Sequence, residues 1–207
     1  MPASAFRAMI KIGLTGGIAS GKSTVSRWLM AQGYPVIDAD RVSREVVTPG
    51  EKGLHLIADH FGEAMLLPTG ALDRKRLGAL IFQDDKKRKL LNELLHPLIR
   101  TRMLQQLEEL EKRREPIAFL DIPLLYESGL ETLTDKTIVV YVTPEQQLKR
   151  LMKRNGLTEE QARERIDAQM PLEEKAKRAD AIIDNNGSVT KTEEQIRALL
   201  HKGLFDC

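Results

Sequence analysis

The stretch Ile10–Thr24, IKIGLTGGIASGKST, decides the fold of this chain. Its apolar start, Ile10 to Leu14, is typical of a buried strand, and a glycine-bearing turn and a helical pattern follow directly. The turn from Gly16 to Ser23 reads GGIASGKS and matches G-x-x-x-x-G-K-[ST] without a gap. Because the pattern lies between a strand and a helix, as a phosphate-binding loop must, it predicts binding of a nucleoside triphosphate.

The residue types of this loop suit phosphate binding. Gly16 and Gly21 permit backbone conformations that turn successive N–H groups toward an anion. The helix that begins near Gly21 adds unpaired donors and the positive end of its dipole. We expect Lys22 to reach the β- and γ-phosphates and Ser23 to ligate Mg²⁺. The alternative is a plain glycine turn. The predicted nucleotide contacts are Gly17, Ala19, Ser20, Gly21, Lys22, Ser23 and Thr24, the last at the α-phosphate.

Composition limits the classes of function. The chain has 207 residues, a formal net charge of +2 and 30% charged residues, so one domain with small additions is expected and nucleic acid is not the expected partner. Cys207 is the only cysteine, which excludes an intramolecular disulfide and a cysteine-based metal site. No apolar run approaches the ~20 residues of a membrane span. We expect a cytoplasmic protein without a membrane partner, a monomer or small homo-oligomer, with residues 1–8 as a disordered extension.

Strand-like runs alternate with helical patterns along the chain. This alternation predicts an α/β protein with the P-loop nucleoside-triphosphate hydrolase fold, a five-stranded parallel sheet flanked by helices. The expected strands are residues 10–14, 34–37, 117–121, 137–142 and 181–183. The expected helices are residues 22–32, 41–47, 52–61, 73–82, 84–114, 145–155, 158–170 and 189–201, with Pro97 kinking or dividing the longest.

Acidic residues follow two of the expected strands. Asp38 and Asp40 end the second strand, and Asp121 ends the third. Ligands of open parallel sheets bind beyond the carboxyl ends of the strands, so these carboxylates are expected near the phosphate-binding loop. An acid after an apolar strand is the usual carboxylate near Mg²⁺ in such proteins, acting through a water, and we assign that role to Asp121. Acids also end strands without any such role.

Two helical insertions interrupt the alternation. We predict one kinase domain over 9–203, whose core is 9–48, 115–143 and 180–203. Residues 49–114 are the predicted substrate-binding subdomain, and 144–179 are the predicted lid. In the lid, Arg150 and Arg154 are four residues apart and share a helix face, where they are predicted to stabilise charge on a transferred phosphoryl group. A solvated face with salt bridges is the alternative.

Several segments together resemble one family. The segments TGGIASGKST, VIDAD, LLHPLIR, DIPLLYESGL, VTPEQQLKRLMKR and ADAIIDNNG are similar, in order and spacing, to those of dephospho-coenzyme A kinases. The resemblance extends from about Met9 to about Leu200. Ala19 stands where members often have glycine, and alanine also fits the loop. The loop alone would indicate only a large superfamily, whereas the other segments are more specific.

This resemblance implies transfer of the ATP γ-phosphoryl group to the ribose 3′-hydroxyl of dephospho-coenzyme A, the last step of coenzyme A synthesis. It implies that Asp40 is the base, although the residues alone leave Asp38 and Asp40 open, and both are predicted to bind substrate. The other implied substrate contacts are His96, Pro97, Arg100, Pro123, Leu124 and Leu125. The implied adenine contacts are Asn185, Asn186 and Gly187.

The sequence leaves other interpretations open. His96 could merely cap a helix end, and Asn186-Gly187 could be a plain turn. Glu127 follows the family pattern without an assignable role. Another small-molecule kinase on the same fold, such as a nucleoside or nucleotide kinase, is the first rival function. A P-loop ATPase that switches a partner protein is the second, although the chain lacks the guanine-reading N-K-x-D motif.

Overall fold

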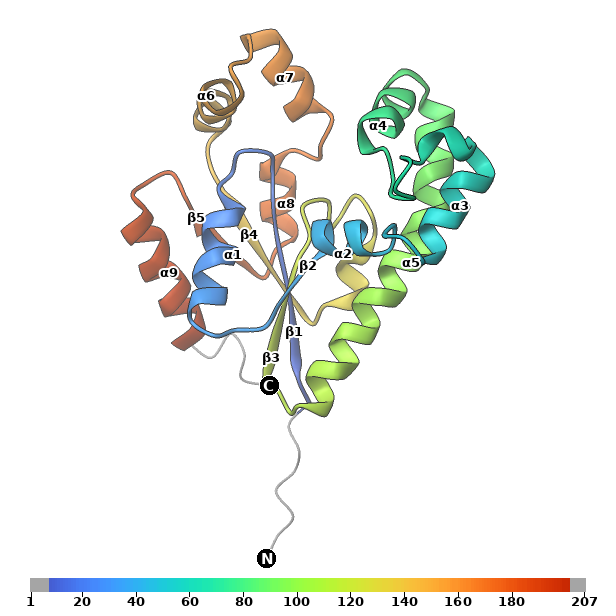
Figure 1. The fold of residues 1–207 in the computed structure, drawn as a ribbon. Coiled ribbons are helices and arrows are strands. Elements are labelled where there is room, and N and C mark those ends of the chain that lie inside the picture. Colours follow the sequence, from blue (N-terminus) through green and yellow to red (C-terminus); the bar gives the residue numbers. More distant parts are fainter. Residues whose placement is uncertain (1–7, 202–207) are drawn as a thin grey trace, which may run out of the picture. The chain divides into compact units, whose positions relative to one another are not determined.

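A five-stranded sheet organises the structure, a computed structural model that describes residues 8–201. The strands are β1 (Ile10–Gly16), β2 (Val36–Asp38), β3 (Ile117–Asp121), β4 (Lys136–Tyr141) and β5 (Ala181–Asp184), in the order β2-β3-β1-β4-β5 (Figure 1). β1 pairs in parallel with β3 and β4, and β4 pairs in parallel with β5. The parallel α/β sheet predicted from the sequence is confirmed, with β1 at its centre. The predicted extension, apart from Ala8, lies outside the described residues.

The chain divides into two compact units. The first contains the sheet and comprises the described residues up to Ile37 and those from Leu110 onward. Its helices are α1 (Lys22–Ala31), η2 (Leu130–Leu133), α6 (Pro144–Asn155), α7 (Glu159–Asp167), α8 (Leu172–Arg178) and α9 (Val189–His201). Within residues 8–201, the length and apolar character needed to cross a membrane are not combined in any helix.

The second unit, Asp38–Glu109, is helical. It contains α2 (Ala39–Glu45), α3 (Lys52–Phe61), η1 (Glu63–Met65), α4 (Arg74–Gln83) and most of α5 (Asp85–Lys112). The Asp73 carboxylate accepts the Arg76 N–H at 3.0 Å and caps α4, as expected. The Arg102 guanidinium binds Glu51 at 2.9 Å and so joins α5 to the start of α3.

The structure corrects one helix boundary and tests the helix around Pro97. α5 is not divided at Pro97, and the kink expected there as the alternative stays a prediction. Pro97 lies on an exposed part of the helix, where water can replace the hydrogen bond that proline cannot donate. The expected helix over 158–170 ends at Asp167, and α8 follows as a separate helix. The α8 sequence LEEKAKR is mostly charged and has one large apolar residue, Leu172, so its pattern does not indicate a helix packed on the sheet.

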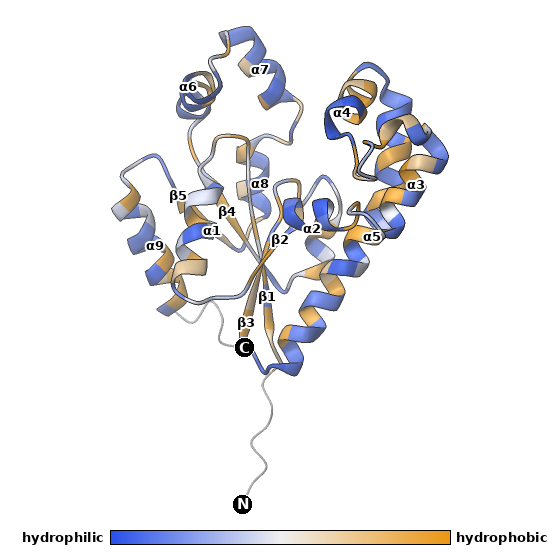
Figure 2. Cartoon of the chain, viewed as in Figure 1, coloured by the Kyte–Doolittle hydropathy of each residue, from blue (hydrophilic) through white to orange (hydrophobic). Residues whose placement is uncertain are grey.

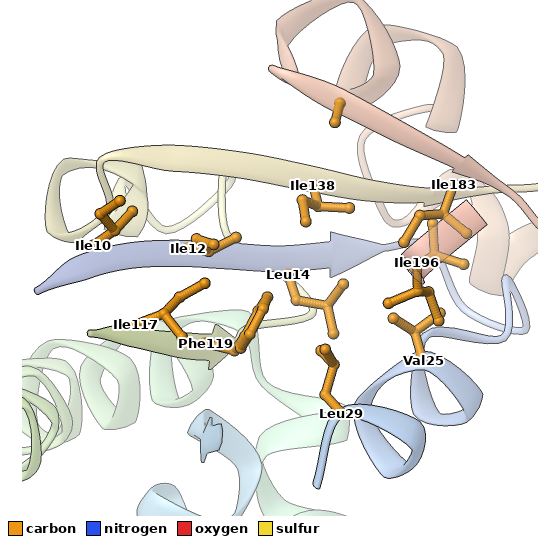
Figure 3. Packing of buried hydrophobic residues seen from close by; sticks show 12 residues of the cluster. Ile10, Ile12, Leu14, Val25, Leu29, Ile117, Phe119, Ile138, Ile183 and Ile196 are labelled. Atoms are coloured by element: carbon orange, nitrogen blue, oxygen red, sulfur yellow. The ribbon is translucent and has the colours of Figure 1, made fainter. Parts of the chain in front are cut away.

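The two faces of the sheet build separate cores. On one face, α1 and α9 pack on the strands through a cluster of isoleucine, leucine, valine and phenylalanine side chains (Figure 3). The α9 ribbon carries both hydrophobic and hydrophilic residues, as a helix covering a sheet must (Figure 2). On the other face, Val139 and Leu172 pack with Tyr126 and Val142. Because Val139 and Val140 alternate along β4, one strand contributes to both cores.

The first prediction concerns Phe119, which is 1% exposed and meets Tyr34 edge-on with ring centroids 5.7 Å apart. Phe119→Ala should lower the free energy of unfolding by about 3–5 kcal/mol, because it leaves a cavity under the sheet. Phe82 is 86% exposed, and Phe82→Ala is the matched control, expected to change stability by less than about 0.5 kcal/mol. Urea unfolding measures both, and equal losses would contradict the placement of Phe119.

Candidate active site

The phosphate-binding loop joins the end of β1 to the start of α1. Within it the backbone is left-handed at Ala19 (φ 60°) and at Gly21 (φ 91°). Gly21 is the N-cap of α1, and it provides no side-chain acceptor for the first helical N–H groups. Those donors and the positive end of the helix dipole are therefore available to an anion, as the sequence motif predicts.

Asn185, after β5, supports the loop from beneath. Its Nδ2 donates to the Ser20 carbonyl at 2.7 Å, and its Oδ1 accepts the Thr192 hydroxyl proton at 2.8 Å. A Cβ on Gly21 would lie only 1.9 Å from Asn185 Nδ2. Glycine is therefore required at position 21 both for its left-handed backbone and for the close approach of this amide. The Asn185 backbone is engaged as well, since its N–H donates to the Tyr141 carbonyl at 2.8 Å and its carbonyl accepts from Arg150 at 2.8 Å.

Two glutamines from the predicted lid hold Ile18 of the loop. Gln147 in α6 donates to the Ile18 carbonyl at 2.8 Å. Gln169, between α7 and α8, accepts the Ile18 N–H at 2.8 Å. Both polar backbone groups of Ile18 are thereby satisfied by side chains more than a hundred residues away in the chain. Neither glutamine is indicated by a sequence pattern, because glutamine is common among solvated residues.

Lys22 and Asp121 meet at the carboxyl ends of β1 and β3. The Lys22 ammonium donates to Asp121 Oδ1, and Asp121 is buried. Ser23 is exposed in the first turn of α1, and Thr24 is half-buried. Ser20 is fully buried, with its Oγ 2.5 Å from a Cβ placed on Gly16. The structure thus brings the predicted lysine and the predicted carboxylate together beside the loop.

The donor set fits a magnesium ion carried by a nucleotide. In residues 8–201, histidine, cysteine, aspartate and glutamate form no group of three or more that could hold a metal ion by itself. Ser23 and Asp121 offer one hydroxyl and one carboxylate. Mg²⁺ commonly keeps several waters and uses one or two carboxylates with substrate phosphates, so this sparse set is suitable.

The two predicted lid arginines have different surroundings. Arg150 is half-buried, and its Nη2 donates to the Asn185 carbonyl at 2.8 Å. Its Nη1 lies 3.8 Å from a Cβ placed on Gly21, so the guanidinium is beside the phosphate-binding loop. Arg154 is exposed and binds Asn155 Oδ1 at 2.8 Å. Of the pair, the structure brings Arg150 to the loop.

The other predicted adenine contacts form a tight turn. Asn186 donates from its backbone N–H and its side-chain amide to Asp184 Oδ1, at 2.8 and 2.6 Å. Its own Oδ1 accepts the Thr143 N–H at 2.9 Å, at the start of α6. Gly187 is exposed. The turn therefore connects the loop-supporting Asn185 to the base of the predicted lid, while its role toward adenine stays a prediction.

A turn after β3 carries the predicted acceptor contacts of the first unit. The Pro123 carbonyl accepts the Thr15 hydroxyl proton at 3.0 Å, which ties the turn to β1. Leu124 is exposed and Leu125 is fully buried, so Leu124 offers the apolar surface and Leu125 anchors the turn. The Tyr126 hydroxyl donates to Thr137 Oγ1 at 3.1 Å, and burial raises the pKa of Tyr126. The phenol therefore stays protonated as a donor.

The second unit carries the remaining predicted substrate residues. Asp38 caps α2, since its Oδ1 accepts the N–H groups of Asp40 at 2.8 Å and Arg41 at 3.2 Å. Asp40, in the first turn of α2, is exposed. His96 and Arg100 are exposed on α5. Asp38 thus has a local structural role in addition to any contact with substrate, whereas the Asp40 side chain is directed to solvent.

The sheet and the loop define a class: this is a P-loop kinase fold. Its solved relatives include TT1252 from Thermus thermophilus, with a TM-score of 0.78 and 38% identity over 95% of this chain and 98% of that one. A dephospho-CoA kinase from Campylobacter jejuni has a TM-score of 0.71 and 34% identity, over 94% and 98% of the two chains.

Residues 10–191 match the family model described as dephospho-CoA kinase. A dephospho-CoA kinase of Geobacillus kaustophilus is 52% identical over 92% of this chain and 95% of its own length. One from Bacillus licheniformis is 53% identical over 91% and 94%. This chain belongs to the dephospho-CoA kinase family, which confirms the family expected from its motifs.

The second prediction separates the two reasons for glycine at position 21. Gly21→Ala should lower affinity for MgATP by more than about tenfold, equivalent to about 1.4 kcal/mol, because the loop must shift away from Asn185. Gly33 is also left-handed (φ 84°) but has open space around it, so Gly33→Ala is the matched control. It should cost about 1–2 kcal/mol of stability and leave affinity unchanged. Calorimetric titration and urea unfolding measure the two quantities, and equal affinities would refute the steric argument.

Proposed function

We propose that this chain transfers the γ-phosphoryl group of ATP to the ribose 3′-hydroxyl of dephospho-coenzyme A, giving coenzyme A and ADP. The observation that carries the proposal is membership of the dephospho-CoA kinase family over residues 10–191, together with a complete phosphate-binding loop on a kinase fold. The similarity extends over 94–95% of the relatives' own length.

The loop binds the triphosphate of ATP. Backbone N–H groups of α1 and its dipole hold the phosphates, and the Lys22 ammonium exchanges its contact with Asp121 for oxygens of the β- and γ-phosphates. Ser23 and Asp121 would hold Mg²⁺, and the ion would supply neutralisation of charge on the phosphate oxygens.

Asp40 orients the acceptor and takes its proton. The 3′-hydroxyl oxygen forms a bond to the γ-phosphorus, the bond from that phosphorus to the oxygen it shares with the β-phosphate breaks, and the hydroxyl proton passes to the Asp40 carboxylate. A loose transition state places most of the barrier in alignment and charge, so Lys22 contributes more than the base. The second unit, with His96, Pro97 and Arg100, binds the acceptor.

Arg150 stabilises the transferred group. Its guanidinium lies beside the phosphate-binding loop, with one nitrogen committed to the Asn185 carbonyl and others available. A planar guanidinium is suited to the equatorial oxygens of a phosphoryl group in transit. Arg154 is farther along the helix and binds its neighbour Asn155, so we assign it a smaller part.

The acceptor is tested by ADP release from MgATP with purified protein. We expect ADP only with dephospho-coenzyme A, matched by one added phosphate in the product mass. The parallel acceptors are nucleosides, nucleotides and small hydroxy acids. If turnover occurs only with one of these other acceptors, the assignment of the phosphate-binding loop stands and the proposed acceptor substrate is wrong. ADP formation without any acceptor would favour an ATPase instead.

The third prediction concerns the choice of base. Asp40→Asn should lower kcat by about 10²- to 10⁴-fold with MgATP affinity nearly unchanged, as expected for a positioned acid or base. Asp38→Asn is the matched control, because asparagine also caps helices well and the substitution removes only the charge. A larger loss in the Asp38 variant, measured by steady-state kinetics, would identify Asp38 as the base.

The fourth prediction compares the lid arginines. Arg150→Ala should lower kcat by about 10³-fold, the lower end of the range for an arginine that stabilises a transferred phosphoryl group. Arg154→Ala, one turn away on the same helix, should retain most of the turnover. Steady-state kinetics give kcat, and titration gives the affinity for MgATP. Two silent variants would mean that this helix face is merely solvated.

A further inference from the structure

Lys175 of α8 is a completely buried lysine, with 0% of its side chain exposed. Its ammonium is within hydrogen-bond distance of three acceptors. These are Glu127 Oε1 at 2.7 Å, the Pro123 carbonyl at 3.1 Å and the Gly16 carbonyl at 3.3 Å. An ammonium has three N–H donors and no acceptor, so each donor has a partner. Neither the sequence motifs nor the proposed chemistry accounts for this residue.

The three acceptors belong to segments that serve the proposed reaction. Gly16 ends β1 and begins the phosphate-binding loop. Pro123 begins the turn with the predicted acceptor contacts, and its carbonyl also accepts from Thr15. Glu127 lies in the same turn, and its Oε1 additionally accepts the Met170 N–H at 3.1 Å. The buried Lys175 ammonium therefore connects the phosphate-binding loop and the turn after β3, and through Glu127 it also reaches the segment that enters α8.

The contact through Glu127 continues to the loop by a second route. Met170 follows Gln169, whose Oε1 accepts the Ile18 N–H. Glu127 therefore binds the backbone of Met170, and Gln169 binds the backbone of Ile18. Through these two bonds the segment 169–170 is held between the turn after β3 and the phosphate-binding loop. The segment lies within the predicted lid, residues 144–179, and leads into α8, which carries Lys175 itself. A displacement of any one of these parts would disturb the partners of the other two.

We propose that Lys175 is a positioning residue, which fixes the phosphate-binding loop, the Pro123–Leu125 turn and the lid segment 169–170 in one geometry. The proposal rests on the proposed function. Two carbonyl oxygens and a carboxylate gathered at one buried point repel each other, and the ammonium both neutralises and orients them. Phosphoryl transfer depends on alignment of donor and acceptor, so the geometry that Lys175 fixes contributes to turnover.

Stability alone does not account for this arrangement. Burying the Lys175 ammonium costs hydration free energy that offsets much of its attraction to Glu127, and replacing both partners of such an ion pair by apolar residues of similar volume is often neutral for stability. An apolar pair at positions 127 and 175 would also fill the space. What an apolar side chain cannot do is hold the carbonyls of Gly16 and Pro123 toward a common point. Geometric specificity is therefore the property that the lysine adds.

The fifth prediction tests this role with Lys175→Met, which keeps the length and removes the donors. We expect kcat/KM for dephospho-coenzyme A to fall by about 10²-fold, the loss that a displacement of about 1 Å far from the chemistry can cause. KM for the acceptor and Kd for MgATP should both rise. Lys177→Met is the matched control, because Lys177 is exposed on the same helix and binds Glu174 at 2.6 Å. Lys177→Met should have the kcat/KM, KM and Kd of the parent protein.

A purely structural role gives a different result. It would lower the melting temperature or the active fraction of Lys175→Met while KM and Kd stay unchanged, and that outcome overturns the proposal. Circular dichroism establishes that the protein compared is folded. If Lys175→Met does not fold, Glu127→Gln carries the test, because it keeps the shape and an acceptor for Met170. It should raise the same KM and Kd less strongly, and unchanged values would overturn the proposal.

The double variant Lys175→Met/Glu127→Gln tests whether the pair acts as a unit. Its loss in kcat/KM should be close to that of Lys175→Met alone, because residues in contact are not additive. A loss equal to the product of the single losses would contradict the shared role. Should the parent protein fail to phosphorylate dephospho-coenzyme A, the proposed function is wrong. Kd for MgATP then tests the positioning role of Lys175 by itself. Weaker MgATP binding by Lys175→Met than by the parent would support that role at the phosphate-binding loop.

Discussion

The structure depends on holding a short backbone segment in a conformation that it would not adopt alone. The phosphate-binding loop needs left-handed backbone at Ala19 and Gly21, and its inward N–H groups repel one another until an anion arrives. Its stability must therefore come from outside the loop. Asn185 beneath Ser20, and Gln147 and Gln169 on Ile18, supply that support through hydrogen bonds of 2.7–2.8 Å.

Residues of the predicted lid form part of the support of the phosphate-binding loop. α6 contributes both Gln147, which holds the loop, and Arg150, which lies beside it. The segment after α7 contributes Gln169, and α8 contributes the buried Lys175. The same part of the chain therefore both supports the loop and carries the arginine proposed for transfer.

Two lysines at the loop have opposite surroundings and serve different purposes. Lys22 meets Asp121 at the carboxyl ends of the strands, where we propose that both groups exchange partners with phosphate and Mg²⁺. Lys175 is enclosed by Gly16, Pro123 and Glu127, and its three donors are all used within the protein. The first lysine suits chemistry, because its contacts can change. Lys175 suits positioning, because its contacts cannot change without disturbing the turn after β3 and the phosphate-binding loop.

The sequence by itself determined the sheet, the loop and the family. Strand and helix periods and the eight-residue loop pattern are local, so they can be read before folding, and β3 and α9 have the predicted ends. The unbroken course of α5 depends on Pro97 lying on an exposed part of the helix, and exposure is not reported by a local pattern. Gln147, Gln169, Glu127 and Lys175 became visible only in the tertiary structure. Their partners are distant in the chain, and glutamine, glutamate and lysine look like ordinary solvated residues until the fold brings those partners to them.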